Sequence, residues 1–274
     1  MREDSGTFAE RYGRWAIVTG AAQGIGSAFA GELVARGLAV LLVDRDLERL
    51  AVRTLELRDL GAEVFELAVD LAAPGAAESI LGAARGLDVG LLVSNAALSW
   101  VGPFTDQPID VALTQLEVNC RVPLVLVHGL VDRLVERGRG GIVLVSSGSG
   151  LRGSPLVAGY AATKAWTLVL AESLWDELRD AGVDVMAVIP GTTRTPGWTA
   201  TNPQPSLSTA VVMEPDEVVR EALDALGSVP SIQPGAANRD SEAFLATMDR
   251  ADAVRLVGGV MRATYPDAGA GSAS

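Results

Sequence analysis

The chain has very few of the residues that most often bind metal ions or form disulfides. Its 274 residues include one cysteine, Cys120, and one histidine, His128. A single cysteine cannot form an internal disulfide, which is typical of proteins from a reducing compartment. One histidine and one cysteine make no His/Cys ligand pattern, so we expect no bound metal ion. Both residues fall within a predicted helix, where we expect them to pack rather than to react.

Basic charge and long apolar runs are also scarce. Lys and Arg number 22 against 34 Asp and Glu, which gives a net charge of −12. An acidic chain repels a phosphate backbone, so we expect no nucleic acid partner. No uninterrupted apolar run is long enough to span a membrane, and the first ten residues lack the apolar core of a secretory signal. We therefore expect a cytoplasmic protein without a membrane span.

Apolar residues make up 49% of the chain and come in short runs that alternate with amphipathic stretches. Continuous apolar strands are typical of a sheet that is covered on both faces. The repeated strand–helix order predicts an α/β fold with a Rossmann-like, doubly wound parallel sheet flanked by helices. The predicted strands are residues 15–19, 39–43, 63–69, 89–93, 141–146, 183–189 and 230–233, and the predicted helices are residues 24–36, 47–59, 76–84, 108–136, 158–180 and 215–226.

No linker divides the chain, so we predict a single domain over residues 1–267. The Pro-, Ser- and Thr-rich residues 196–214 are predicted to form a loop inserted in this domain. Further along, residues 241–263 are predicted to form an extra C-terminal helix. Residues 268–274 are small and polar, so we expect a disordered tail there.

A glycine-rich segment lies where the first predicted strand meets the first predicted helix. The spacing Gly20-x-x-x-Gly24-x-Gly26 lets the backbone turn tightly and approach a pyrophosphate, to which the helix N-terminus offers unpaired N–H groups. The alternative is an ordinary tight turn, because this spacing alone is weak evidence. The candidate contacts to a dinucleotide in this segment are Gly20, Gln23, Gly24, Ile25 and Gly26.

Acidic and small residues follow the next three predicted strands. Asp44 ends the second strand, where a carboxylate accepts hydrogen bonds from ribose hydroxyls and repels a 2′-phosphate, which favours NAD over NADP. Arg45 is able to pair with that phosphate, and Asp44 is alternatively a cap of the next helix. The other candidate cofactor contacts after these strands, which are equally typical of plain turns, are Asp70, Leu71, Asn95, Ala96 and Ala97.

Tyr160 and Lys164 lie one helical turn apart, and Ser147 lies upstream at the end of the fifth predicted strand. A lysine ammonium at about 4 Å contributes at most roughly 4 kcal/mol at an effective dielectric of 20, enough to lower a tyrosine pKa from about 10 to about 7. Tyr160 is then a general base for alcohol oxidation and a general acid in the reverse direction, with Ser147 holding the reacting oxygen. Tyr-x-x-x-Lys alone is also typical of an amphipathic helix face.

Taken together, these motifs resemble the short-chain dehydrogenase/reductase family over nearly the whole chain. The resemblance implies an NAD(P)-dependent oxidoreductase that interconverts a secondary alcohol and a ketone by hydride transfer. An acid at the position of Asp44 usually marks a preference for NAD in this family. The residues that carry the resemblance are Thr19-Gly20-x-x-x-Gly24-Ile25-Gly26, Asn95-Ala96, Asn119, Ser147, Tyr160-x-x-x-Lys164 and Pro190-Gly191-x-x-x-Thr195.

The resemblance also implies a catalytic tetrad. Asn119 would hold a water and stabilise a kink in its helix, Ser147 would orient the substrate oxygen, and Tyr160 would be the acid and base. Lys164, beside Tyr160, would bind the nicotinamide ribose and join a proton relay to solvent. The implied contacts to the nicotinamide end are Pro190, Gly191, Thr193 and Thr195.

Two features depart from the commonest form of the family. Ala97 stands where the family usually has glycine, which affects the fine positioning of the cofactor, and residues 241–263 lengthen the C-terminus. A weaker resemblance, in residues 12–16, 87–90 and 146–150, is to hydroxysteroid dehydrogenases and long-chain 3-oxoacyl reductases. Those relatives tend to use NADPH, so one alternative is an NADPH-dependent 3-oxoacyl or steroid ketoreductase. A second alternative is a catalytically silent nucleotide-binding regulator.

Loops after the strands carry the candidate substrate pocket, formed by Trp100, Leu151 and Trp198 beside Ser147 and Tyr160. Open α/β sheets bind ligands at this edge, and tryptophans there favour a hydrophobic alcohol or ketone substrate. Loop anchoring or subunit contact explains the tryptophans nearly as well. The two long predicted helices carry apolar residues on more than one face, and the family resemblance implies that they form the interface of a homodimer or homotetramer.

Overall fold

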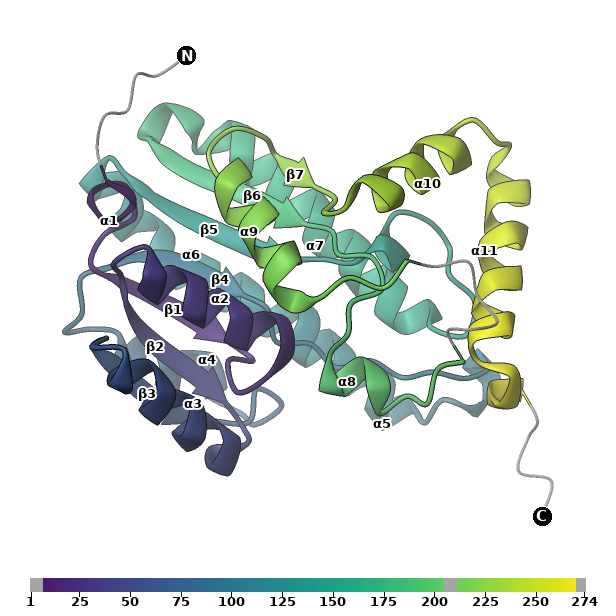
Figure 1. Cartoon of the computed structure of the whole chain (residues 1–274), viewed down its shortest axis with the longest axis horizontal. Helices are drawn as coiled ribbons and strands as arrows, with labels where there is room; N and C mark the ends of the chain where they lie inside the picture. The colour runs from purple at the N-terminus through teal and green to yellow at the C-terminus, as the bar shows by residue number, and fades with distance from the viewer. Residues whose placement is uncertain (1–6, 205–210, 270–274) are drawn as a thin grey trace.

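The computed structural model describes residues 7–204 and 211–269 and has the predicted parallel sheet at its centre (Figure 1). The strands are joined in the order β3-β2-β1-β4-β5-β6-β7, and every pairing is parallel. The strands are β1 (Trp15–Thr19), β2 (Ala39–Asp44), β3 (Val64–Ala68), β4 (Val89–Ser94), β5 (Gly140–Val145), β6 (Val183–Val188) and β7 (Ser231–Ile232).

The strand order reverses at β1, which pairs with β2 on one side and with β4 on the other. The loops that leave the carboxyl ends of β1 and β4 therefore run to opposite sides. In open α/β sheets this switch point opens the crevice that binds ligands. The fold thus places the glycine-rich segment after β1 next to the Asn95 turn after β4, as the sequence pattern predicts.

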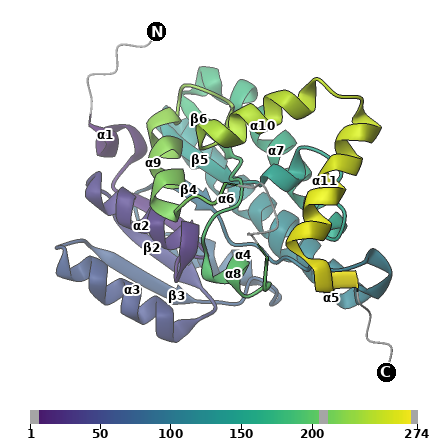
Figure 2. The same ribbon diagram turned by 45° about the vertical axis from the view of Figure 1, so that its right-hand side comes forward.

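Helices cover both faces of the sheet, and each face has its own apolar core. On one face, α2 (Gly24–Ala35), α3 (Leu47–Asp59) and α9 (Pro215–Ala225) pack on alternate strand residues such as Ala16 and Val18. On the other face, α4 (Ala76–Ala83), α6 (Val122–Arg137) and α7 (Ala158–Glu177) pack on residues such as Trp15 and Ile17. The two layers of helices are visible in Figures 1 and 2. Burial on both faces explains why the strands are apolar throughout.

The long helix predicted at residues 108–136 is interrupted. It consists of α5 (Ile109–Leu116), a π-helical turn at Glu117–Arg121, and α6. Pro123 lies in the first turn of α6 and has no N–H to donate to the carbonyl of Asn119, so the regular ladder cannot continue there. Asn119 lies in this π-helical turn, where its side chain is buried. Its side chain is directed at the loop after β4, where it contacts Leu98.

The C-terminal extension differs from the prediction of one helix at residues 241–263. It contains two helices, α10 (Ala236–Ala246) and α11 (Arg250–Thr264), and the Asp249 side chain caps the second by accepting a hydrogen bond from Ala251 N. Figure 2 shows both helices on the side of the molecule where the carboxyl ends of the strands lie. A 3-10 turn, Pro266–Gly269, follows them; the rest of the predicted tail, residues 270–274, lies outside the described residues.

Two short helices complete the described chain. The sequence pattern missed α1 (Phe8–Tyr12), although Thr7 and Glu10 form a reciprocal capping box at its start. The predicted loop at residues 196–214 contains α8 (Pro196–Thr199), and its residues 205–210 are not described. Within the described ranges, no helix is both long and apolar enough to cross a membrane.

Candidate active site

The glycine-rich turn between β1 and α2 has no room for side chains. A Cβ on Gly26 would collide with the carbonyl oxygen of Gly20, while Gly20 and Gly24 have φ values of +68° and +60°. These left-handed conformations favour glycine. Gln23, at the N-cap of α2, makes no side-chain capping bond, so the first N–H groups of this helix have no side-chain cap. A close backbone approach at such a helix end fits the pyrophosphate of a dinucleotide.

Asp44 is held in place by two backbone donors beside this turn. Its Oδ2 accepts from Ala22 N at 3.0 Å, and its Oδ1 accepts from Asp46 N at 3.1 Å. The alternative that Asp44 caps the next helix is wrong, because the N-cap of α3 is Asp46, which accepts from Arg49 N at 3.1 Å. Asp44 is therefore oriented towards the turn rather than towards α3.

Two arginines lie close to Asp44 in the sequence. Arg45, the predicted competitor for a 2′-phosphate, is exposed. Arg49 was not predicted from the sequence, yet its Nη1 donates to Gln23 Oε1 in the glycine turn at 2.7 Å. The sequence signal that could have indicated Arg49 is its position in the first turn of α3, which begins three residues after Asp44. The predicted binding site for the adenosine end of the cofactor therefore contains the Asp44 carboxylate, held by two backbone donors, and the side chains of Arg45 and Arg49 close to it in the sequence.

The turn after β4 is tied to the end of β1. Thr19 Oγ1 accepts from Asn95 N at 3.0 Å and from Ala96 N at 3.1 Å, and Asn95 Nδ2 donates to the Thr19 carbonyl at 3.0 Å. Thr19 therefore fixes the two sides of the switch point relative to each other. Ala97 at the end of this turn is exposed, so its methyl group is accommodated.

The segment after β3 looks less like a binding site than expected. Asp70 is exposed, and its Oδ1 accepts from Ala72 N at 2.9 Å, as in an ordinary turn. Leu71 is buried in the core on the α4 side of the sheet. A cofactor role for Asp70 and Leu71 remains a prediction.

Ser147, Tyr160 and Lys164 are brought together at the carboxyl end of β5. Ser147 lies two residues after the end of this strand and is hydrogen-bonded to Tyr160, while its Oγ also accepts from Ser149 N at 3.2 Å. Lys164 is buried, its Nζ lies 5.6 Å from the centre of the Tyr160 ring, and it donates to the Val145 carbonyl at 2.7 Å. The spacing of four residues on α7 accounts for the shared direction of Tyr160 and Lys164.

The electrostatic effect of Lys164 on Tyr160 differs from the expectation. Burial raises the pKa of Tyr160, the hydrogen bond with Ser147 lowers it, and Tyr265 raises it. Burial also lowers the pKa of Lys164 to about 8. The expected depression of the Tyr160 pKa by Lys164 is absent because the ammonium is directed at the Val145 carbonyl and is itself desolvated. Tyr160 is consequently protonated at neutral pH in the protein alone.

Asn119 connects α7 with the loop after β4. Its Oδ1 accepts from Leu98 N at 2.8 Å, and its Nδ2 donates to the Leu98 carbonyl at 2.9 Å and to Thr163 Oγ1 at 3.0 Å. Thr163, which the sequence did not single out, donates to the Tyr160 carbonyl at 2.7 Å. The helix irregularity expected at Asn119 is present as the π-helical turn, whereas its contact with a water remains a prediction.

The segment at residues 190–195 borders both halves of the site. Pro190 O accepts from Gly148 N at 2.8 Å, directly beside Ser147. At the other end of the segment, the Thr195 side chain lies against Gly24. A Cβ added to Gly24 would be 3.1 Å from Thr195 Cγ2. Thr193 lies between them and is buried. The structure therefore brings the predicted nicotinamide contacts between the glycine turn and the Ser147–Tyr160 pair.

The residues of the candidate substrate pocket are partly covered by the rest of the chain. Trp100, Leu151 and Trp198 are all half-buried. A residue that the sequence did not indicate joins this side: the hydroxyl of Tyr265, after α11, lies 3.1 Å from Thr201 Oγ1. Tyr265 is also close enough to influence the pKa of Tyr160. Only the tertiary fold brings this C-terminal residue to the site, so no local sequence signal marks it.

The donor set fits a dinucleotide better than a metal ion. The crowded glycine turn, the uncapped start of α2 and the oriented Asp44 carboxylate match the pyrophosphate and ribose of such a group. Across the residues that the structure describes, no group of three or more His, Cys, Asp or Glu side chains is arranged to hold a metal.

Comparison with known proteins gives concordant matches. A family profile described as short chain dehydrogenase matches residues 14–206. A 7beta-hydroxysteroid dehydrogenase from Clostridium sardiniense is 33% identical over 252 residues, which cover 92% of this chain and 97% of that protein. The profile spans all the predicted site residues, whereas α10 and α11 follow it.

Solved structures agree with these sequence matches. A structure from a study of 7beta-hydroxysteroid dehydrogenase stereoselectivity has a TM-score of 0.84 at 30% identity and covers 92% of this chain and 99% of its own. A short-chain dehydrogenase from Sphingobium yanoikuyae in complex with NADPH has a TM-score of 0.74 at 30% identity, with coverage of 86% and 97%. The similarity thus extends over the sheet, the site and most of the C-terminal extension.

Proposed function

The chain belongs to the short-chain dehydrogenase family and is an oxidoreductase that acts on CH–OH donors, and on this premise we propose that it interconverts a bulky, apolar secondary alcohol and its ketone with NAD. The observation that carries the proposal is the meeting of Ser147, Tyr160 and Lys164 beside the glycine turn, with residues 190–195 between them. The bound nicotinamide supplies or accepts the hydride. The chain's own residues handle the proton and the substrate oxygen.

Tyr160 moves the proton in this proposal. Its raised pKa keeps the hydroxyl protonated at neutral pH, which suits proton donation to a ketone oxygen. In this proposal the hydroxyl of Ser147, which is hydrogen-bonded to Tyr160, holds the same oxygen. In the oxidative direction Tyr160 has to lose its proton first, so mildly alkaline conditions favour alcohol oxidation. Lys164, with a pKa of about 8, is poised to exchange a proton in the same range.

The preference for NAD rests on Asp44. Both of its oxygens are oriented by backbone donors, so the carboxylate stays in place and repels a 2′-phosphate. Initial rates with NAD and NADP test this, and we expect kcat/KM to favour NAD by about tenfold or more, or about 1.4 kcal/mol. Asp44→Asn keeps an acceptor for Ala22 N without the charge and should reduce the preference. Strong selectivity of the wild type for NADP would refute the assignment.

The proposed substrate is bulky and apolar. Trp100, Leu151 and Trp198 are half-buried and lie on loops that follow strands, and Tyr265 adds a hydroxyl close enough to influence the pKa of Tyr160. A panel of secondary alcohols at mildly alkaline pH, followed by NADH absorbance, tests this directly. Higher kcat/KM for polycyclic or long-chain alcohols than for small polar ones is the expected result. The reverse order would contradict the apolar pocket.

A second candidate is an NADPH-dependent steroid or 3-oxoacyl ketoreductase. Arg45 and Arg49 favour it, since both lie near Asp44 and are able to pair with a 2′-phosphate. The NADPH-bound relative also uses this fold for that cofactor. The cofactor comparison above separates the two candidates. A silent regulator has no need of an ordered Ser147, Tyr160 and Lys164, and loss of turnover in Tyr160→Phe would dismiss it.

We also propose a homodimer or homotetramer joined through the α5–α7 region. Leu113, Leu116, Leu124 and Val169 in these helices are apolar and exposed. Several exposed apolar side chains of this size are typical of a subunit interface. Light scattering should report a dimer or tetramer for the wild type and a smaller species for Leu113→Glu with Val169→Glu. A monomeric wild type would overturn the assignment.

A further inference from the structure

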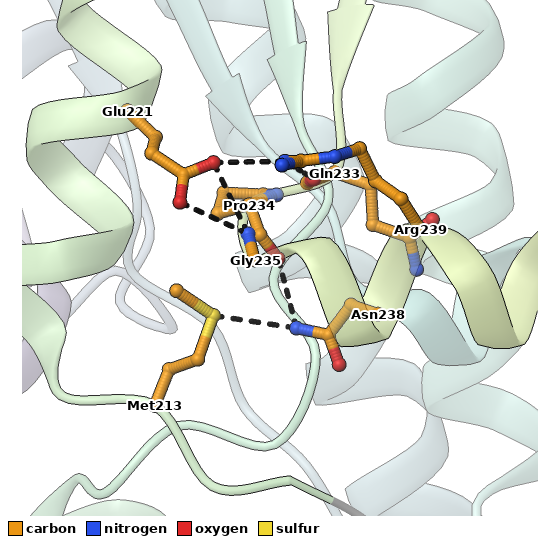
Figure 3. Close-up of polar contacts among 7 residues, drawn as sticks. All are labelled: Met213, Glu221, Gln233, Pro234, Gly235, Asn238 and Arg239. Carbon is orange, nitrogen blue, oxygen red and sulfur yellow. Dashed lines mark hydrogen bonds and ion pairs between the residues drawn. The ribbon is translucent and has the colours of Figure 1, made fainter.

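The first turn of α10 is fixed to the body of the domain by a small polar cluster (Figure 3). Both carboxylate oxygens of Glu221, in α9, accept from Gly235 N at 3.1 and 3.2 Å. One of them also accepts from Arg239 Nη1 at 2.8 Å, and the same guanidinium donates to the Gln233 carbonyl at 2.9 Å. Gly235 has a φ of +85°, a conformation that few other residues adopt. The start of α10 is therefore rigidly placed.

Asn238 projects from this turn towards the site. Its Nδ2 donates to the Pro234 carbonyl at 2.8 Å and to the Met213 sulfur at 3.3 Å, as Figure 3 shows. Met213 is in turn paired with the predicted nicotinamide segment, since its N donates to Thr192 O at 3.0 Å and its O accepts from Arg194 N at 2.8 Å. Asn238 thus braces residues 192–194 through Met213.

The same amide also lies directly against Gly191. A Cβ on Gly191 would be 2.6 Å from both Cγ and Nδ2 of Asn238 and closer still to Oδ1. Gly191 is not in the left-handed region, so its backbone conformation does not require glycine. A methyl group at this position would instead displace the Asn238 amide from its hydrogen bonds. Pro190, one residue earlier, accepts through its carbonyl oxygen from Gly148 N. Gly148 is the residue after Ser147, so a shift of Gly191 would be passed to the backbone next to this serine.

We propose that Asn238 is a positioning residue that holds residues 190–194 at the nicotinamide end of the cofactor site and so controls dinucleotide affinity and its alignment with Ser147 and Tyr160. This inference rests on the proposed function. It assigns a cofactor-positioning role to the C-terminal extension, which lies beyond the residues matched by the family profile. Asn238 acts through residues 190–194 and not on the substrate. Its replacement should therefore change the affinity for the cofactor more than it changes kcat.

The test measures NADH affinity by fluorescence titration in five proteins: wild type, Asn238→Ala, Asn238→Gly, Gly191→Ala and the double variant Gly191→Ala with Asn238→Gly. Loss of the Asn238 hydrogen bonds should raise the Kd for NADH about fivefold, or about 1 kcal/mol. Gly191→Ala should raise it about tenfold or more because its new methyl group meets the amide. In the double variant the space is vacated, so the methyl group should cost less than about twofold relative to Asn238→Gly alone.

Asp240→Ala is the matched control, because Asp240 lies on the exposed side of the same helix. It should leave Kd, kcat and thermal stability unchanged. In Asn238→Ala, a raised KM for NAD with a nearly unchanged kcat separates positioning from a general loss of structure, which thermal unfolding monitors. Unchanged NADH affinity in Asn238→Ala, or strictly additive effects in the double variant, would overturn the inference while leaving the proposed function intact. A wild type that binds neither NADH nor NADPH would overturn both.

Discussion

The two ends of the sheet each contain a tyrosine with a raised pKa, and we propose chemistry for only one of them: Tyr12 is buried, whereas Tyr160 is half-buried. At the amino ends of the strands, Tyr12 donates to Asp184 Oδ2 at 2.9 Å, and Arg11 pairs with the same oxygen at 2.6 Å. At the carboxyl ends, Tyr160 has Ser147 as its hydrogen-bond partner and Lys164 near its ring. Burial is the main cause that raises the pKa of both tyrosines.

The partners make the difference between these tyrosines. Asp184 raises the pKa of Tyr12 further, so this hydroxyl stays a donor that joins α1 to β6. Ser147 is neutral and lowers the pKa of Tyr160, which leaves its proton available to a substrate oxygen. Burial therefore raises the pKa of both tyrosines, whereas the hydrogen-bond partner raises the pKa of Tyr12 and lowers that of Tyr160.

Replacing each tyrosine with phenylalanine should separate the two ends most strongly. Tyr160→Phe removes the proton donor and should lower turnover by about 10²- to 10⁴-fold, the usual contribution of general acid–base catalysis. Tyr12→Phe, the matched control, should leave turnover unchanged. Steady-state rates together with NADH titration check this, because Tyr160→Phe should still bind the cofactor. Equal turnover in Tyr160→Phe and wild type would abolish the distinction.

Stability should show the opposite pattern. Tyr12→Phe removes a hydrogen bond to a charged group and should lower the free energy of unfolding by about 1.5–3 kcal/mol. Urea denaturation of the two variants and the wild type measures this. We expect Tyr160→Phe to change stability less, because its partner Ser147 is neutral. A Tyr12→Phe variant as stable as the wild type would mean that the amino-end cluster does not anchor α1.

The pH dependence of stability should reveal the buried lysine at the carboxyl end. The pKa of Lys164 is about 8 in the folded chain against a reference of 10.5. Between these values the unfolded chain binds more protons, so stability attributable to Lys164 rises with pH, by at most about 1.4 kcal/mol per pH unit. The difference in unfolding free energy between wild type and Lys164→Met should therefore move in favour of the wild type from pH 8 to 9.5. A difference that is constant with pH would contradict a desolvated lysine.

The ion pairs at the two ends of the sheet should differ least in the effect of an arginine-to-lysine replacement on stability and KM. At the carboxyl end, Arg152 binds Glu242 of α10 through both terminal nitrogens. Arg152→Lys cannot make this two-point contact and should lower the unfolding free energy by about 1 kcal/mol or less. A rise in KM for a bulky alcohol should accompany it, because the pair joins the loop after Ser147 to the C-terminal extension. Arg11→Lys, at the amino end, should leave that KM unchanged; equal KM changes in both variants would remove the contrast.

Local patterns in the sequence predicted the strands, the glycine turn and the order of Ser147, Tyr160 and Lys164, because each depends on the period of its element or on the residue that follows a strand. They could not predict contacts between distant elements. The contacts of Asn119 with Leu98 and of Tyr265 with Thr201 join segments that are far apart in the sequence, and no local pattern marks them. The spacing of Tyr160 and Lys164 indicated a short separation but not their burial, so the expected pKa shift of Tyr160 was wrong in direction.

The most direct test of the account follows deuterium from a bulky secondary alcohol that is labelled on its carbinol carbon. Mass spectrometry of the dinucleotide after incubation at mildly alkaline pH reports whether the label has moved. The account predicts that the wild type transfers the deuterium to NAD, and that Tyr160→Phe binds NADH with similar affinity but transfers the label at least about 10²-fold more slowly. Reduced dinucleotide without deuterium, or equal transfer by Tyr160→Phe, would contradict it.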